Sequence, residues 1–250
     1  MLALITGASS GMGEEMAKYL AGMGWDLILV ARNKDKLNTV KNSLPKGIKV
    51  NVISADLSHP DNAKNLFQQV KDMPVDMLIN NAGFGIFGEF SQVDLDREIQ
   101  LINTNITSLH ILTKLFLQKF LKEDKGRIIN VASSAGFLAG PLMASYYASK
   151  NYVVRLTQAI YEELRRKKSN VHISCFCPGP VKTNFNDVAG VRFAIKGIDS
   201  VYASRYCIDK ALKNKMIIMP SFTMKCANFL MRFVSQKRLT RINYNIQKKK

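Results

Sequence analysis

The sequence opens with LALITGASSGMG, Leu2 to Gly13, in which a short apolar run meets a glycine-rich turn and then the helical pattern EEMAKYL. The run is too short for a helix and is typical of a buried strand. Gly7, Gly11 and Gly13 permit a tight turn, so a diphosphate can lie over the N–H groups and positive dipole of the helix start. Three residues separate the first two glycines, unlike the common G-x-G-x-x-G spacing. The stretch predicts a nucleotide-binding turn, and the alternative is an ordinary turn.

The rest of the chain repeats this alternation of strand and helix. The expected strands are LALIT, DLILVAR, IKVNVIS, DMLIN, RIINVAS, VHISCFC and MIIM. The expected helices are residues 12–23, 37–44, 62–70, 99–121 and 146–167. Such an order predicts right-handed βαβ units, and hence a doubly wound α/β Rossmann fold with a seven-stranded, mainly parallel sheet flanked by helices. Ligands of such a fold bind beyond the carboxyl ends of the strands.

Bulk composition favours one cytoplasmic domain. The chain has 250 residues, of which 47% are hydrophobic and 22% charged, close to the globular average. The start MLALITG lacks the features of a signal peptide, and no apolar run reaches transmembrane length. Four cysteines do not form a disulfide framework in a chain of this length. His172, Cys175 and Cys177 lie in one expected strand without a second ligand pair, so we expect no metal site.

Residues 221–250 form a basic tail that follows the expected domain of residues 1–220 and carries +8 of the formal net charge of +17. No acidic residue occurs from residue 211 to residue 250. Apolar residues recur at helical spacing in this tail, at Phe222, Cys226, Phe229, Leu230 and Phe233. This pattern is typical of helices on anionic membranes, but also of a helix packed on the domain or on a subunit partner. The hypothesis is weak peripheral contact with the inner membrane face; charge alone does not predict nucleic-acid binding, because no nucleic-acid motif accompanies it.

The segment LVARNKDKL bears on the choice of dinucleotide. Where an acidic residue would repel a 2′-phosphate, Arg32 stands instead, with Lys34 and Lys36 nearby. This favours NADP(H), with NAD(H) as the alternative, and the competing interpretation is a solvated basic helix start. Asp56 could accept a hydrogen bond from the adenine amino group or cap the following helix.

Several motifs together resemble those of the short-chain dehydrogenase/reductase superfamily over nearly the whole chain. They are TGASSGMG, ADL ending at Leu57, NNAG at residues 80–83, Asn105, Ser133, the Tyr146/Lys150 pair and PGPVKT at residues 178–183. NNAGFGIFGEF and the basic tail are similar to a broad bacterial group of NADP-dependent reductases with undefined substrates. The resemblance implies carbonyl or alcohol substrates, a dimer or tetramer, and cofactor contacts from Gly7, Ser9, Ser10, Gly11, Met12, Gly13, Arg32, Asp56, Leu57, Asn81, Ala82, Gly83, Tyr146, Lys150, Pro178, Gly179, Val181 and Thr183.

Two adjacent tyrosines in MASYYASKN compete for the role of proton donor. Helical geometry lets either Tyr146 or Tyr147 approach Lys150. The family pattern Tyr-x-x-x-Lys selects Tyr146, and Ser133 stands thirteen residues before it, as the family spacing requires. Tyr147 is then a packing or pocket residue.

The resemblance gives these residues chemical roles. Tyr146 would protonate the carbonyl oxygen as hydride adds, and Ser133 would hold that oxygen. Lys150 and the oxidised nicotinamide would lower the pKa of Tyr146, which is ordinarily about 10. Lys150 would also bind the nicotinamide ribose, Asn105 would position a water, and Val181 and Thr183 would contact the carboxamide. A catalytically silent nucleotide sensor on the same fold is the alternative.

The segment of about residues 184–200 is expected to form a lid over the substrate. Its Arg192 and Lys196 either attract an anionic substrate or are solvated loop charges. An apolar pocket would draw on phenylalanines and leucines that could equally belong to the core: Phe84, Phe87, Phe137, Leu138, Leu142, Phe185 and Phe193.

Overall fold

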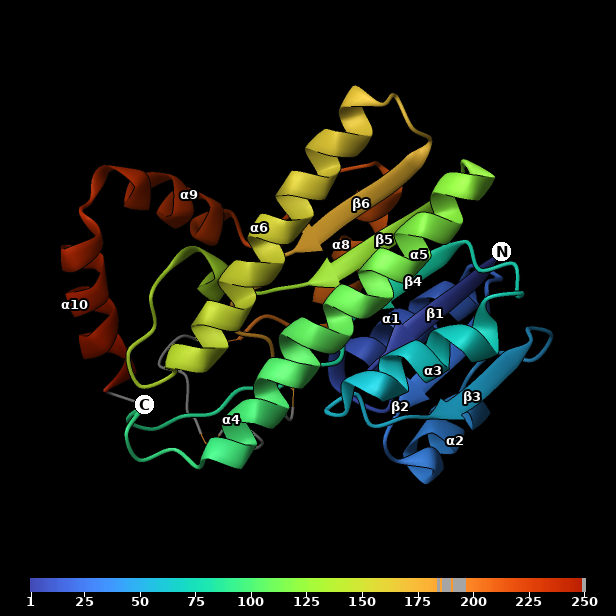
Figure 1. Ribbon diagram of the computed structural model, residues 1–250, viewed down its shortest axis with the longest axis horizontal. Coiled ribbons are helices and arrows are strands. Elements are labelled where there is room, and N and C mark those ends of the chain that lie inside the picture. Colours follow the sequence, from blue (N-terminus) through green and yellow to red (C-terminus); the bar gives the residue numbers. More distant parts are fainter. Residues whose placement is uncertain (184, 186–189, 191–196, 249–250) are drawn as a thin grey trace.

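The computed structural model describes residues 1–183, 185, 190 and 197–248 (Figure 1). One seven-stranded sheet runs through the molecule in the order β3-β2-β1-β4-β5-β6-β7, and every pairing is parallel. This confirms the expected fold class, and each expected strand is present. The strands are β1 (Leu2–Thr6), β2 (Asp26–Ala31), β3 (Val50–Ser54), β4 (Met77–Asn80), β5 (Gly126–Val131), β6 (Val171–Phe176) and β7 (Ile217–Ile218).

Helices cover both faces of the sheet, which is why its central strands are apolar on both sides. All five residues of β1 are buried: Ala3 and Ile5 contribute to the core under α1 and α8, whereas Leu2 and Leu4 contribute to the core under α3 and α5. The first face carries α1 (Gly11–Gly22), α2 (Lys34–Asn42) and α8 (Ser200–Leu212). The second carries α3 (Pro60–Val70), α5 (Leu109–Glu123) and α6 (Ala144–Arg166).

The long middle helix expected at residues 99–121 is present, but it is not a continuous α-helix. It consists of α4 (Leu95–Ile102), a π-helical turn (Asn103–Ser108) and α5. Inside the turn, the buried Asn105 amide donates to the carbonyl of Phe84 at 2.9 Å and accepts from the Phe84 N–H at 3.1 Å. The wider turn therefore coincides with a tertiary anchor, as π-helical turns often do at functional sites.

The basic tail forms two helices beyond β7 rather than one. They are α9 (Phe222–Leu230) and α10 (Gln236–Gln247), joined through a short 3₁₀ turn, Met231–Phe233. In Figure 1 they lie in red beside the start of α6. Leu239, Asn243 and Gln247 of α10 are buried, whereas α9 has no buried residue. Of the alternatives for the tail, packing on the domain is therefore found for α10. No helix in the described ranges is both long and apolar enough to cross a bilayer.

The turn between β1 and α1 is tightly packed against the end of β4. Gly7 adopts φ +65°, and the Asn81 amide donates to the carbonyls of Thr6 and Gly7 at 3.0 and 3.1 Å. A Cβ on Gly13 would lie 2.2 Å from the Gly7 carbonyl oxygen. The glycines thus let the first turn of α1 approach the strand end, as a nucleotide-binding turn requires.

We expect Gly13→Ala to lower the free energy of unfolding by about 1–3 kcal/mol, because its methyl group meets backbone that cannot move aside. Gly22→Ala, near the end of the same helix, is the control, since a Cβ there meets nothing within 4 Å. Urea unfolding followed by circular dichroism measures both. Equal stability of the two variants would contradict the packing described for Gly13.

Candidate active site

The ends of β1, β4, β5 and β6 lie along one edge of the sheet. Thr6 Oγ1 accepts from the backbone N–H groups of Asn81 and Ala82, each at 3.0 Å, which fixes the end of β4 against the glycine turn. A Cβ on Gly83 would lie 2.8 Å from Asn105 Oδ1 and 3.4 Å from Lys150 Nζ. The backbone at Gly83 is therefore packed between the π-helical turn and α6.

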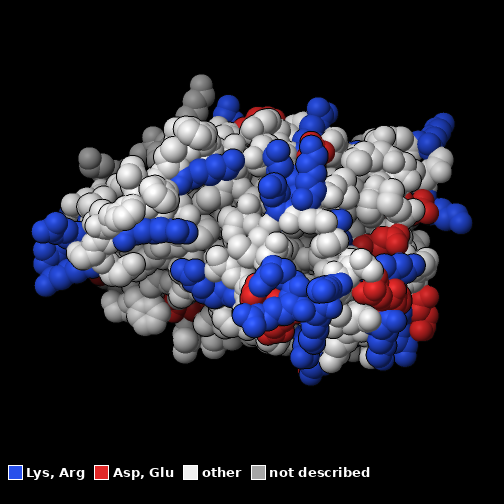
Figure 2. Space-filling view, turned by 90° about the horizontal axis from the view of Figure 1, so that it is seen from above, with Lys and Arg blue, Asp and Glu red and all other residues white. Residues whose placement is uncertain are grey.

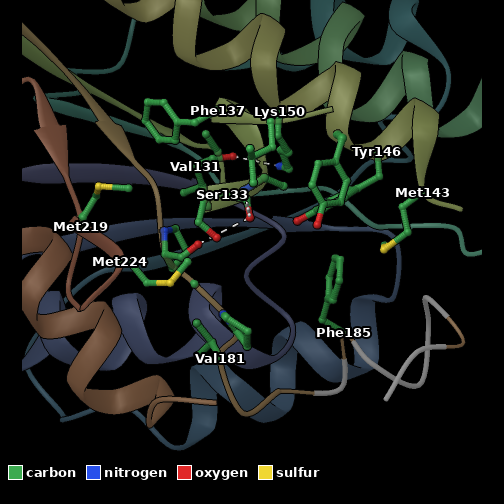
Figure 3. A pocket seen from close by; sticks show the side chains of 18 of the residues that line it. Val131, Ser133, Phe137, Met143, Tyr146, Lys150, Val181, Phe185, Met219 and Met224 are labelled. Carbon is green, nitrogen blue, oxygen red and sulfur yellow. Dashed lines mark hydrogen bonds between the residues drawn. The ribbon is translucent and has the colours of Figure 1, made fainter. Parts of the chain in front are cut away.

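Helix α6 directs Tyr146 and Lys150 toward β5. Both side chains are buried, and Lys150 Nζ donates to the Val131 carbonyl at 3.0 Å. The same nitrogen lies 5.9 Å from the centre of the Tyr146 ring. Because residues one turn apart share a helix face, the two side chains reach the same cavity (Figure 3).

Ser133 reaches that cavity from the end of β5. Its hydroxyl accepts from the Ala135 N–H at 3.1 Å and points to the Pro178 carbonyl at 3.5 Å. It lines the same cavity as the Tyr146 phenol. The structure therefore brings the serine and tyrosine of the sequence-based prediction together, and the longer contact to Pro178 leaves the serine hydroxyl able to turn toward a ligand.

Burial governs the electrostatics of the cavity. Burial raises the pKa of Tyr146 to about 12, against a smaller opposing effect of the Ser133 hydroxyl. Burial lowers the pKa of Lys150 to about 8, with the Cys175 and Cys177 thiols opposing it. Without a dinucleotide, desolvation therefore leaves the pKa of Tyr146 above its usual value, and the lowering expected from Lys150 together with the oxidised nicotinamide stays a prediction.

Asn105 is linked to the site by Ser149, a residue that the sequence-based prediction did not include. Its amide donates to Ser149 Oγ at 3.1 Å, and Ser149 in turn donates to the Tyr146 carbonyl at 2.7 Å. Ser149 follows Tyr146 by three residues on α6, a spacing that could have indicated a shared face. Asn105 thus connects the π-helical turn to the helix that carries the tyrosine and the lysine.

Tyr147 faces the tail. Its hydroxyl accepts a hydrogen bond from Gln247 Nε2, and its ring meets the Tyr146 ring edge-on at 6.0 Å. Nearby, Asn243 Nδ2 donates to the Ala139 carbonyl at 2.7 Å. Burial raises the pKa of Tyr147 as well, and Asn243 and Gln247 oppose the shift. The prediction of a packing or pocket residue is confirmed, and its partners come from α10.

A cavity of about 330 Å³ contains Ser133, Tyr146 and Lys150 (Figure 3). Phe137, Leu138 and Phe185 line it as predicted, whereas Phe84 and Phe87 pack against the cluster around Tyr146. Phe193, Arg192, Lys196 and most of the expected lid lie outside the described residues. The sequence-based prediction missed the methionines and the tail: Met143, Met219, Met224, Ala227, Asn228, Met231, Asn243, Ile246 and Gln247 also line the cavity.

Several of the predicted cofactor-binding residues reach the cavity that contains Tyr146. Met12, Asn81, Gly83, Pro178, Gly179, Val181 and Thr183 line the same cavity. The side chain of Thr183 comes within 3.3 Å of the position of a Cβ on Gly11, so this loop lies over the glycine turn. Ser10 precedes α1 without a side-chain capping bond, and Ser9 beside it is half-buried. The N–H groups at this helix start fit a diphosphate.

A second cavity of about 400 Å³ lies at the ends of β2 and β3, lined by Arg32, Ser54, Ala55, Asp56, Asn62, Asn65 and Gln69. Burial raises the pKa of Asp56, but hydrogen bonds from Ser58 and the charge of Arg32 outweigh this and leave the pKa below its usual value. Asp56 Oδ1 accepts from the Ser58 N–H at 3.0 Å, in the turn before α3 rather than at its cap. Leu57 is buried and accepts from Ser108 Oγ at 2.7 Å. The polar lining fits the adenosine end of a dinucleotide, and the Arg32 guanidinium can bind a phosphate there.

Cys175 of β6 and Cys177, directly after the strand, belong to a hydrophobic cluster. Cys175 and Cys177 are buried with their sulfur atoms 3.6 Å apart, and burial raises the pKa of Cys177 well above its usual range. Within the described part of the chain, no three metal-ligating side chains of His, Cys, Asp or Glu cluster together.

Comparison with known proteins agrees with this architecture. The family model "short chain dehydrogenase" matches residues 1–190. A Dictyostelium discoideum protein named dehydrogenase/reductase SDR family protein 7-like is 36% identical over 193 residues, which cover 74% of this chain and 60% of that protein. Ketoacyl reductase HetN of Nostoc sp. is 34% identical over 219 residues, covering 85% of this chain and 75% of HetN.

Solved structures show the same fold. A short-chain dehydrogenase from Sphingobium yanoikuyae, in complex with NADPH, superposes with a TM-score of 0.83 at 27% identity, covering 94% of this chain and 96% of that one. From the family match and the shared fold, the chain belongs to the short-chain dehydrogenase/reductase family.

Proposed function

We propose that the protein is an oxidoreductase that transfers hydride between NADP(H) and a carbonyl or alcohol substrate. The observation that carries the proposal is the convergence of the Ser133 hydroxyl, the Tyr146 phenol and the Lys150 amine on one largely apolar cavity beside the glycine turn. A serine, a phenol and an amine are the groups needed to polarise and protonate a carbonyl oxygen.

A dinucleotide held by Met12, Asn81 and Thr183 along the glycine turn would supply the hydride for reduction of a carbonyl carbon. Ser133 donates a hydrogen bond to the carbonyl oxygen, on which negative charge builds as the C–H bond forms. Tyr146 then transfers its proton to that oxygen, which gives the alcohol and a tyrosinate. The tyrosinate, whose charge is costly in a buried site, regains a proton through the neighbouring polar groups.

Lys150 and Asn105 support that proton transfer. The positive charge of Lys150 stabilises the tyrosinate, and its hydrogen bond to the Val131 carbonyl holds the amine in place. Asn105 is held by Phe84 and Ser149, so it can position a water on the route from solvent to Lys150. Ser149 is the additional positioning residue in this proposal.

The cofactor preference rests on Arg32. It lines the cavity at the ends of β2 and β3, where a guanidinium can bind the 2′-phosphate through several donors. The Sphingobium yanoikuyae structure contains NADPH, which supports the same choice here. NAD(H) is the alternative, since Asp56 in the same cavity can accept from a ribose or adenine group.

A homo-oligomer is part of the proposal. Large apolar side chains are exposed on α4 and α5, with Ile99 at 45%, Ile102 at 41% and Leu121 at 37% exposure. Burial of such residues between copies is the usual role of an apolar surface. Sedimentation velocity is expected to show a dimer or tetramer at micromolar concentration, and a monomer throughout would refute this.

We expect Tyr146→Phe to reduce turnover by about 10²–10⁴-fold, because the proton donor is lost while the ring remains. Binding of NADPH, followed by fluorescence, is expected to stay within about twofold. Tyr147→Phe is the matched control, because it removes the neighbouring hydroxyl without removing the proton donor, and its turnover should persist. Assays use NADPH oxidation with a panel of aldehydes and ketones. Similar losses in both variants would show that the wrong tyrosine was chosen, and NADPH binding without turnover in the unaltered protein would favour the silent sensor.

Arg32→Ala is expected to raise the Kd for NADPH by about 10–100-fold, which corresponds to the loss of a charge-assisted hydrogen bond of about 1.5–3 kcal/mol. The Kd for NADH should change much less, because NADH has no 2′-phosphate. Lys41→Ala, in the last turn of α2, is the control for general loss of positive charge. If Arg32→Ala and Lys41→Ala weaken NADPH binding alike, the guanidinium has no specific role.

A further inference from the structure

Helix α9 has apolar residues on two opposite faces. Met224 and Ala227, followed by Met231 after the last turn, line the cavity that holds Tyr146. The opposite face carries Phe222, Cys226 and Phe229, and Phe233 in the following 3₁₀ turn continues their four- and three-residue spacing; these four residues form the outer stripe. A helix on the surface of a domain usually has one apolar face, so the outer stripe is not explained by packing on the cavity.

The outer stripe is strongly exposed. The exposed fraction is 76% for Phe222, 57% for Phe229 and 76% for Phe233, and the adjoining Leu230 is 61% exposed. The rings of Phe229 and Phe233 meet edge-on, with centroids 5.5 Å apart. Single exposed apolar residues are common, but a contiguous group of large ones marks an interaction surface.

Positive charge lies beside one flank of this stripe. Lys225 on α9 and Arg232 in the following 3₁₀ turn are exposed, and Lys225 Nζ also donates to the Tyr206 hydroxyl at 3.1 Å. Lys237, Arg238 and Arg241 are exposed on α10. In Figure 2 the end of the molecule that carries these helices, at the left, shows mostly white and blue side chains. Since no acidic residue occurs from residue 211 onward, nothing within the tail neutralises this charge.

The positive charge distinguishes between two candidate partners of the outer stripe, a second copy of the chain and an anionic membrane. In a symmetric contact between two copies of α9, Lys225 and Arg232 of one copy would approach the same residues of the other, and like charges would oppose the contact. An anionic lipid surface instead attracts the basic flank and accepts the phenylalanines among its acyl chains. Apolar side chains with lysine and arginine along one flank fit that surface.

We propose that the outer stripe of α9 binds an anionic membrane surface and that the cavity behind it takes apolar, lipid-borne carbonyl compounds. The substrate class rests on the proposed function, whereas the membrane contact does not. Because the same helix forms a wall of the cavity with its inner face, membrane contact would place that wall at the bilayer surface. Methionine side chains line this wall, and their flexibility suits long or irregular acyl groups.

The first experiment measures binding without any chemistry. The full-length protein is sedimented with vesicles of phosphatidylglycerol and phosphatidylcholine, or of phosphatidylcholine alone, at low and high salt. We expect binding to the anionic vesicles at low salt and weaker binding at high salt. Phe229→Ser combined with Phe233→Ser should reduce binding at least about tenfold, because the inserted apolar area is lost.

Matched variants separate the apolar part from the charged part. Phe90→Ser alters another exposed phenylalanine, 68% exposed and far along the chain from the tail, and should leave binding unchanged. Lys225→Gln and Arg232→Gln should each weaken binding to anionic vesicles by about fivefold. Thermal unfolding of every variant is expected to match that of the unaltered chain, because none of these side chains is buried.

The second experiment tests delivery to the cavity. The double phenylalanine variant should reduce a long-chain ketone supplied in anionic vesicles about tenfold more slowly, with an unchanged rate for a short water-soluble ketone. Equal rates with the vesicle-borne ketone would refute delivery, while absence of turnover with every carbonyl compound would refute the proposed function and leave the binding result standing.

Three results would overturn the membrane contact itself. They are absence of vesicle binding at low salt, equal binding to vesicles with and without phosphatidylglycerol, and unchanged binding in the double phenylalanine variant. Sedimentation velocity provides a further check: loss of self-association in that variant would show that a second copy, rather than lipid, covers the stripe.

Discussion

The hydrogen bond from Lys150 to the Val131 carbonyl determines the geometry of the candidate site. It joins α6 to the end of β5 at a point that is closed to solvent. Tyr146 lies one turn before Lys150 on the helix, and Ser133 lies two residues beyond Val131 on the chain. A single buried contact therefore sets the position of the phenol relative to the hydroxyl. Burying the amine is costly, which is reflected in its pKa of about 8, so the surrounding structure must hold this arrangement in place.

A buried polar network supplies part of that support. The Asn80 amide on β4 donates to Asn130 Oδ1 at 2.9 Å and to Thr113 Oγ1 at 3.0 Å, and the Asn130 amide donates to Thr157 Oγ1 at 3.1 Å. These contacts connect two central strands to α5 and α6. Because Thr157 lies about two turns after Lys150, α6 is held to β5 at two points along its length. Rotation of α6 about its axis would break both contacts, so these contacts with β5 fix the position of Tyr146.

Sequence patterns predicted those parts of the molecule that depend on local periodicity. Strand and helix alternation indicated the parallel sheet, and the family resemblance at Ser133, Tyr146 and Lys150 anticipated that they share one cavity. The π-helical turn at Asn105 could not be predicted in this way, because it depends on contacts with Phe84 and Ser149 from distant segments. The same reason explains why the approach of Gln247 to Tyr147 was missed: the two residues are a hundred positions apart.

Burial of Tyr146 in the apolar cavity makes ionisation of its phenol costly. Raising the pKa of Tyr146 from 10.0 to about 12 makes tyrosinate about 3 kcal/mol costlier than in water. A general acid works best when its pKa is near the operating pH, so the protein alone is poorly matched to proton transfer. A positive charge that arrives next to the phenol, from the protonated Lys150 or an oxidised nicotinamide, opposes this cost in a medium where charges interact strongly. In the proposed mechanism, burial makes the acidity of Tyr146 depend on the charges brought into the cavity, which would couple proton transfer to the binding of the dinucleotide.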